Sequence, residues 1–295
     1  MTGVIIINKP QGMTSFGVVA RLRKILGEKR IGHSGTLDPM ATGVMTVLLG
    51  GATKFCQLLP DHNKAYEGVF RLGITTDTLD ITGAVLTESP VTAGLDEVRE
   101  AAGKFTGEIT QIPPMYSAVS VGGRRLYELA REGATVERPE RNALIYLLNI
   151  DKAQGENEYK IYVECSSGTY IRTLVSDIGE ALGCGAALTA LNRVKANGFT
   201  LAQAADLPEA GDEEGEKLLR EKIFPTDAAL KKYPALSVSG AQGVRFHNGG
   251  DLALDRLHEC RSKGLYRVYD PDGAFLGLGE NDGESLKIKR VFIES

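Results

Sequence analysis

The sequence predicts an α+β protein built on a mixed, largely antiparallel sheet and followed by a small C-terminal unit of short strands. Strand-like and helix-like segments follow each other without the steady strand–helix alternation of a parallel sheet. The 35 glycines suit many turns and strands rather than a helical bundle. A chain of 295 residues is long enough for about two domains, which we place at residues 1–230 and 235–295.

The first elements follow from the spacing of apolar residues. Residues 3–8 form a β-branched apolar run that ends at a Pro-Gln-Gly turn, which is typical of a buried strand. A cap at Thr14 or Ser15 and apolar positions at helical spacing predict a helix up to Leu26. The apolar run at 44–49 predicts a central strand, after which the chain turns into a short helix.

The middle of the chain continues these two patterns. Residues 64–73 alternate with the period of a strand, and shorter strands are expected at 84–87 and 159–165. Helical spacing marks residues 95–105 and 173–182, and glycines end the second of these helices. The mixture of elements supports the α+β class.

Two later regions are predicted from turn residues and charge. A proline pair, a basic glycine-rich turn and a short helix indicate an excursion from the sheet over about residues 111–142, with five arginines between Arg124 and Arg141. Residues 208–222 are acidic and polar, and we expect a connecting region with a short helix. A Pro-Asp-Gly turn at 271–273 predicts a hairpin in a small β-barrel-like C-terminal unit.

Composition and charge narrow the classes of function. We expect no membrane span, because no apolar run approaches 18 residues, and no signal peptide, because a basic lead-in is absent. The four cysteines and four histidines are scattered, so we expect free thiols and no metal site. The net charge is −4, but residues 1–60 carry seven basic and two acidic side chains, and such a basic region can bind a polyanion.

The segment Gly32–Gly43 is the stretch with the clearest functional potential. Its glycines and proline predict a loop, and Asp38 is biased toward extended backbone because Pro39 follows it. An Asp-Pro pair alone is typical of a simple turn. A functional interpretation therefore depends on motifs elsewhere in the chain.

Those motifs resemble the TruB family of bacterial tRNA pseudouridine synthases. The segments that carry the resemblance occur in the family's order: Asn8–Ser15, Gly32–Gly43, Lys64–Tyr66, Gly168–Leu174 and Gly183–Arg193. The resemblance implies a pseudouridine-synthase fold for residues 1–230 and a PUA-type RNA-binding unit at 235–295. It also implies that uridine at position 55 in the T-loop of tRNA is the substrate.

The resemblance implies roles for individual residues. Asp38 matches the essential aspartate, Arg172 the arginine that pairs with it, and Tyr66 the tyrosine placed against the target base. A close cation predicts a lowered pKa for the Asp38 carboxyl. His33 matches a histidine that binds the RNA, Tyr170 and Leu191 match residues that flank the substrate pocket, and Lys9 with Pro10 is expected to support the catalytic loop. Lys54 and the arginines from Arg124 to Arg141 are candidates for phosphate contacts.

The implied chemistry needs neither a cofactor nor a metal, because an ionised carboxylate can itself add to the base or sugar or remove a sugar proton. The target uridine is stacked in the T-loop, so the resemblance implies base flipping, which costs a few kcal/mol. The expected partner is the T-arm stem-loop of tRNA. A cytoplasmic monomer without an obligatory protein partner is implied.

Three other interpretations use some of the same residues. A protein that captures or refolds tRNA would use the same basic face but would not need Asp38, Tyr66 and Arg172 together; refolding as an additional role stays open. A guide-RNA-dependent relative that modifies ribosomal RNA is disfavoured, because no lysine-rich tail is visible. A nucleotide-binding enzyme is rejected, because no phosphate-loop or dinucleotide motif follows a strand.

Overall fold

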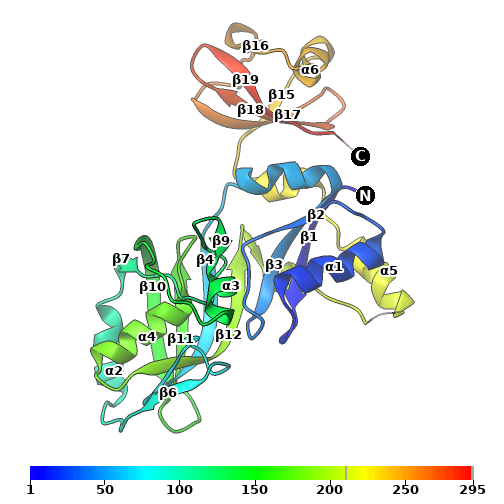
Figure 1. Ribbon diagram of the computed structural model, residues 1–295. Helices are drawn as coiled ribbons and strands as arrows, with labels where there is room; N and C mark the ends of the chain where they lie inside the picture. Colours follow the sequence, from blue (N-terminus) through cyan, green and yellow to red (C-terminus); the bar gives the residue numbers. More distant parts are fainter. Residues whose placement is uncertain (210, 294–295) are drawn as a thin grey trace.

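A ten-stranded mixed sheet forms the larger part of the molecule, and a five-stranded sheet forms its C-terminal end (Figure 1). The computed structural model describes residues 1–209 and 211–293. Residue 210 of the expected connecting region and residues 294–295 of the expected C-terminal unit lie outside the described residues. In the described part of the chain, no helix is long and apolar enough to cross a membrane.

The large sheet has the strand order β14-β1-β3-β12-β4-β11-β10-β7, with β2 paired to β3 and β13 to β12. Its strands are β1 (Gly3–Lys9), β2 (Ile31–Ser34), β3 (Thr42–Leu49), β4 (Lys64–Leu72), β7 (Gly107–Gln111), β10 (Arg141–Lys152), β11 (Glu158–Cys165), β12 (Ala186–Ala196), β13 (Phe199–Thr200) and β14 (Ala205–Asp206). The β1–β14 and β3–β12 pairs are parallel, and the remaining pairs are antiparallel. The α+β class with a mixed, largely antiparallel sheet is therefore confirmed.

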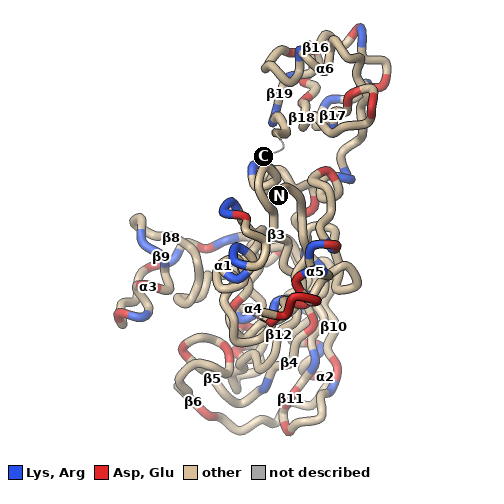
Figure 2. The backbone as a smooth tube through the Cα atoms, turned by 90° about the vertical axis from the view of Figure 1, so that its right-hand side faces the viewer, with Lys and Arg blue, Asp and Glu red and all other residues tan. Residues whose placement is uncertain are grey.

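The helices and short elements of this part lie around the sheet. They are α1 (Ser15–Leu26), η1 (Gly50–Leu58), β5 (Ile74–Thr76), β6 (Val85–Glu88), α2 (Leu95–Gly103), β8 (Ser120–Val121), β9 (Arg124–Arg125), α3 (Leu126–Arg131), α4 (Ile171–Ala181), η2 (Leu201–Gln203), α5 (Glu213–Glu221) and η3 (Thr226–Leu230). Helices α2 and α4 cover one face of the sheet, where Val98 and Leu174 pack with Phe70. The chain between β7 and β10 carries β8, β9 and α3, and these three elements extend away from the sheet (Figure 2). We call this segment the projecting hairpin.

Strand β1 shows why an unbroken apolar run marks a central strand. Ile5 and Ile7 pack with α1 on one face, whereas Val4 and Ile6 pack with η1 on the other. Burial on both faces removes the need for alternating polar residues. Helix α1 begins where the Thr14 side chain accepts a hydrogen bond from the Gly17 amide, as its capping position predicts.

The five-stranded sheet has the order β15-β17-β18-β19-β16 and forms a curled half-barrel. Its elements are β15 (Ala235–Ser237), α6 (Gly240–His247), β16 (Leu252–Ala253), η4 (Leu254–Arg256), β17 (Gly264–Tyr269), β18 (Phe275–Asn281) and β19 (Ser285–Val291). The expected hairpin joins β17 to β18, and the Asp270 carboxylate accepts hydrogen bonds from the amides of Asp272 and Ala274. Phe275 and Phe292 pack against Phe55 of the larger part, with ring centroids 5.8 and 6.2 Å from it.

Several predicted elements differ from the structure in extent. The helix expected at 173–182 begins earlier, at Ile171, because Tyr170 already provides the extended residue before it. The short helix after β3 is a 3-10 helix. The strands β10 and β12 were not predicted, although β12 lies in the middle of the sheet between β3 and β4. Register irregularities in β12, after Leu188 and Arg193, break the alternation by which strands are recognised.

Candidate active site

The loop that carries Asp38 connects β2 to β3 and is held from two sides. On one side, Ser15 at the start of α1 shares two hydrogen bonds with Leu37: its Oγ accepts from the amide at 2.9 Å and donates to the carbonyl at 3.1 Å. The Gly12 amide donates to the Pro39 carbonyl at 2.7 Å. These bonds join the N-terminal motif directly to the residues on both sides of Asp38.

Two fully buried cations supply the rest of the support. The Lys9 ammonium donates to the carbonyls of Pro10, Met13 and Pro39 at 2.8, 2.6 and 3.3 Å. Arg193 on β12 donates to the carbonyls at positions 35, 36 and 44 at 3.0, 3.4 and 2.8 Å. Buried carbonyls need such partners, so both cations have a clear structural task here.

Gly43 lets the loop approach β12 closely. Its φ of +102° favours glycine, and a Cβ at this position would lie 2.3 Å from the Arg193 carbonyl oxygen. A larger residue would therefore push the start of β3 away from β12.

Asp38 pairs with Arg172, which lies in the first turn of α4. The Arg172 Nε is 2.9 Å from an Asp38 carboxylate oxygen and 3.7 Å from an Asp80 oxygen. Its two other nitrogens donate to the carbonyls of Thr78 and Tyr116, both at 2.8 Å. Every branch of this guanidinium has a partner, and its side chain is only 5% exposed, whereas that of Asp38 is 35% exposed.

The start and the orientation of helix α4 are fixed by Gln111, the last residue of β7. Its side-chain amide donates to the Tyr170 carbonyl at 3.1 Å and accepts from the Tyr170 amide at 2.9 Å. Gln111 is buried, so this pair of bonds is shielded from water. It places both Tyr170 and Arg172 at the edge of the same cavity.

The sequence-based expectation that the Asp38 pKa is lowered is wrong, because the combined effect of its surroundings raises that pKa. Burial raises the pKa of the Asp38 carboxyl, and the nearby Asp80 carboxylate raises it further. Arg172 lowers it, as expected, and Lys9 does the same, but neither outweighs burial. The expectation considered the ion pair and left out the cost of removing a carboxylate from water.

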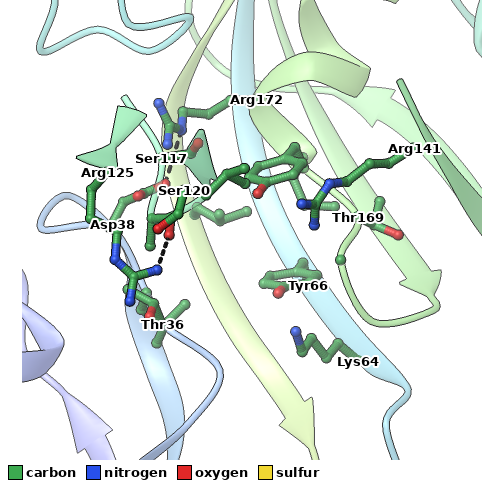
Figure 3. A pocket seen from close by; sticks show the side chains of 17 residues that line it. Thr36, Asp38, Lys64, Tyr66, Ser117, Ser120, Arg125, Arg141, Thr169 and Arg172 are labelled. Atoms are coloured by element: carbon green, nitrogen blue, oxygen red, sulfur yellow. Dashed lines mark hydrogen bonds and ion pairs between the residues drawn. The ribbon is translucent and has the colours of Figure 1, made fainter. Parts of the chain in front are cut away.

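Tyr66 lies on β4 with its side chain directed into the cavity (Figure 3). It is 6% exposed. Burial raises the pKa of its hydroxyl, although the Arg193 guanidinium opposes the rise. The phenol is therefore neutral near pH 7 and presents an uncharged aromatic ring to whatever enters.

The side chains just described border a cavity of about 440 Å³. Five residues singled out from the sequence line it: Asp38, Tyr66, Tyr170, Arg172 and Leu191. Further polar lining side chains are Thr36, Lys64, Ser117, Ser120, Arg125, Arg141 and Thr169 (Figure 3). The cavity thus brings together residues from the N-terminal loop, β4, the projecting hairpin and α4.

Three predicted RNA contacts lie outside the lining of this cavity. His33 is half-buried on β2; its Nδ1 is buried and finds no hydrogen-bond partner among the described residues, and burial lowers the pKa of the imidazole. Lys54 is exposed on η1. Arg124 is exposed on β9 and pairs with Glu132 of the same projection. The two predicted supports, Lys9 and Pro10, contact each other, because the Lys9 ammonium donates to the Pro10 carbonyl.

Among the five arginines marked in the sequence as phosphate-contact candidates, Arg124 was put forward, but it is the neighbouring Arg125 that lines the cavity, where its guanidinium donates to the Ala118 carbonyl. Adjacent strand residues point to opposite sides, and the sequence does not say which of the two faces inward. Asp80 was also missed. Its carboxylate accepts from the Thr78 hydroxyl at 2.9 Å and the Thr82 amide at 3.0 Å, and this Thr-x-Asp-x-Thr spacing is the available signal.

Among the described residues, no three His, Cys, Asp or Glu side chains gather as they would to hold a metal ion. The cysteines at 56, 165, 184 and 260 are free thiols. The polar groups of the cavity are instead one carboxylate, several cations, hydroxyls and aromatic rings. This set can hold an anionic polymer and present a carboxylate to one of its units.

Comparisons with known proteins agree with this arrangement. The chain matches the models for the TruB family pseudouridylate synthase N-terminal domain over residues 23–171, the tRNA pseudouridylate synthase B C-terminal domain over 172–231, and the pseudouridine synthase II TruB C-terminal region over 234–292. It is 43% identical to tRNA pseudouridine synthase B of Pseudomonas fluorescens (strain Pf0-1), covering 100% of this chain and 96% of that one. The identity to the protein of the same name from Clostridium perfringens (strain 13 / Type A) is 41%, with 100% of both covered.

Solved structures give the same class. A chain in the crystal structure of a Cbf5-Nop10-Gar1 complex aligns with a TM-score of 0.73 and 26% identity, covering 99% of this chain and 85% of that one. A chain in a structure of an H/ACA RNP bound to a substrate RNA containing 2′-deoxyuridine has a TM-score of 0.72, with the same identity and coverage. Fold and site define a pseudouridine synthase, an isomerase acting on uridine in RNA. Within that class, the chain belongs to the TruB family.

Proposed function

We propose that this protein converts uridine to pseudouridine at position 55 in the T-loop of tRNA, with Asp38 as the catalytic residue. The observation that carries the proposal is a carboxylate at a cavity wall, 35% exposed and fixed 2.9 Å from a buried arginine. The proteins named tRNA pseudouridine synthase B, to which the chain is 41–43% identical over its length, support tRNA as the substrate.

The reaction breaks the C1′–N1 bond of uridine, turns the base, and forms a C1′–C5 bond; C5 loses its proton and N1 gains one. Atoms and electrons balance within the nucleotide, so no redox partner is required. Asp38 in its ionised form either adds to the base or sugar or removes a proton from the sugar. Arg172 holds the carboxylate in place and stabilises its negative charge while the cavity shields it from water.

Access to Asp38 requires the uridine to leave the stacked T-loop. Flipping a base costs a few kcal/mol, and stacking on an aromatic side chain recovers about 1–3 kcal/mol. Tyr66 provides a neutral ring inside the cavity for that purpose. Arg125 and Arg141, exposed residues of the lining, contact the phosphates that follow the flipped nucleotide.

We further propose that residues 1–230 form the catalytic domain and residues 235–295 an RNA-binding domain. The cavity is lined by residues of one chain between positions 36 and 191. We also propose that the protein acts as a monomer on the T-arm of tRNA in the cytoplasm.

Mapping the product on an unmodified tRNA transcript tests this function. Carbodiimide treatment marks pseudouridine, and primer extension then stops beside it. We expect one enzyme-dependent stop, beside position 55. A stop at another position, or tight binding of the transcript without any stop, would contradict the proposal, and the second result would favour a protein that only captures tRNA.

A further inference from the structure

Lys64 is a cavity residue that the mechanism above leaves without a task. It is the first residue of β4 and lies two positions before Tyr66, so both side chains point to the same face of the sheet. Lys64 is half-buried and lines the cavity next to Tyr66 (Figure 3).

Lys64 lies close to another cation, Arg193. A Cβ built on Gly35 would lie 3.5 Å from the Lys64 Nζ and 3.4 Å from a terminal nitrogen of Arg193. The Lys64 ammonium and the Arg193 guanidinium therefore both lie beside Gly35 in the Asp38 loop. Arg193 is satisfied by three backbone carbonyls.

Lys64 differs from the other lysine of the site in having no partner. Within residues 1–209 and 211–293, its ammonium has no carboxylate within 4.0 Å and no hydrogen-bond acceptor in the protein. Lys9, in contrast, donates to three carbonyls. The Lys64 ammonium thus supports the fold by no direct hydrogen bond or ion pair within the described residues, and it faces the cavity, where a ligand can reach it.

The protonation of Lys64 is consistent with this uncompensated setting. Burial, together with a smaller effect of the Arg193 charge, lowers the pKa of its ammonium to about 8, and Cys165 acts in the opposite direction. The group is still mostly protonated at neutral pH. A ligand carrying a full negative charge would stabilise that protonated form.

We propose that Lys64 binds a phosphate adjoining the uridine that enters the cavity. A phosphate suits the site better than a neutral uracil carbonyl, because two neighbouring cations favour a full negative charge and ammonium is a point donor to phosphate. The proposal rests on the proposed function, since it takes an RNA nucleotide as the occupant of the cavity.

Salt dependence of RNA binding gives the first test. A T-arm stem-loop is titrated with the wild type, Lys64→Met and Lys64→Arg at several salt concentrations. Loss of one phosphate contact reduces the slope of log Kd against log salt by about 0.7–0.9. We expect this reduction in Lys64→Met and a slope near the wild-type value in Lys64→Arg; an unchanged slope in Lys64→Met would overturn the proposal.

Neutral methylphosphonates placed singly on either side of the target uridine identify the phosphate. At one of the two positions the wild type should lose about tenfold in affinity, whereas Lys64→Met, already weaker by about tenfold, should lose no more. Equal sensitivity of the two proteins at both positions would overturn the proposal. Lost turnover with an unchanged salt slope would also do so, because it would indicate a contact to the base.

Lys160→Met is the matched control, since it removes the same charge from the opposite face of the sheet, where Lys160 is exposed on β11 and pairs in register with Asp151 of β10. Its slope should equal that of the wild type. Thermal unfolding of each variant separates a lost contact from a lost fold. Wild-type protein that binds the stem-loop but makes no pseudouridine would contradict the proposed function. The phosphate contact of Lys64 would still be supported or overturned by the salt slopes and the methylphosphonate substitutions, because these measure binding alone.

Discussion

Arg172 is the residue that connects the segments around the cavity. Through one guanidinium it contacts the Asp38 loop, the polar loop at 77–83 and the base of the projecting hairpin at Tyr116. A residue with fewer donors can replace only part of the contacts of such a buried cation. Its removal would leave two carboxylates close together without the charge that separates them.

We expect Arg172→Met to lose most of its turnover and about 3–5 kcal/mol of unfolding free energy, because it leaves buried groups uncompensated. Arg172→Lys keeps the charge but cannot reach all three segments, so it should recover part of the stability and little of the activity. Urea unfolding and an activity assay on both variants check this. Normal stability of Arg172→Met would show that the ion pair contributes nothing to the fold.

The acid limb of the pH–rate profile should report Asp38. The reaction needs the ionised carboxylate, so kcat/KM should fall as the pH drops through the Asp38 pKa. Since burial and Asp80 raise that pKa, the limb should lie above the ordinary range of an aspartate, about 3.9. Asp80→Asn removes one raising charge and should move the limb to lower pH; a limb that stays in place would contradict the assignment.

At the scale of elements, helix α1 and the Asp38 loop are joined through Ser15. The neighbouring Thr14 only caps the helix. Variants of these two residues can therefore be compared: Thr14 supports only the helix, whereas Ser15 also supports the catalytic loop.

We expect Thr14→Ala and Ser15→Ala each to cost about 1 kcal/mol of stability. Only Ser15→Ala should also lower kcat, because the amide and carbonyl of Leu37 lose their partner next to Asp38. Chemical denaturation and steady-state kinetics of the two variants provide the measurement. Equal kcat values for both would mean that the loop keeps its position without α1.

The elements that the sequence predicts well are those with one dominant pattern. Strand β1 has a continuous apolar run, α1 has a cap and a period, and the loop at Asp38 has its own sequence motif. The central strand β12 was missed because its irregular register interrupts the alternation. Arg193 shows the same limit for single residues, since a buried arginine that binds three loop carbonyls looks, in the sequence, like a surface charge.

At the scale of the whole molecule, the C-terminal sheet packs against η1 of the larger part through aromatic rings. Phe55 is fully buried between Phe275 and Phe292, which come from the C-terminal part of the chain. Tyr233 adds a hydrogen bond to the Leu58 carbonyl at 3.0 Å. Long-range contacts of this kind leave no local pattern, so the sequence predicted two units but not how they pack together.

Phe55→Ala should destabilise the protein by about 3–5 kcal/mol, because it opens a cavity where the two parts of the chain meet. Phe16→Ala is the control: that ring is 68% exposed, and its loss should cost about 1 kcal/mol or less. Urea unfolding of both variants decides the matter. A small effect of Phe55→Ala would mean that the aromatic cluster does not hold the sheets together.

Release of tritium from a tRNA transcript labelled at C5 of uridine tests the central claim most directly. Pseudouridine formation removes this hydrogen, so the wild type should release one tritium for each uridine converted. Asp38→Asn should release none while binding the transcript within a few fold of the wild type. Tritium release by Asp38→Asn at the wild-type rate would contradict the assignment of Asp38 as the catalytic residue.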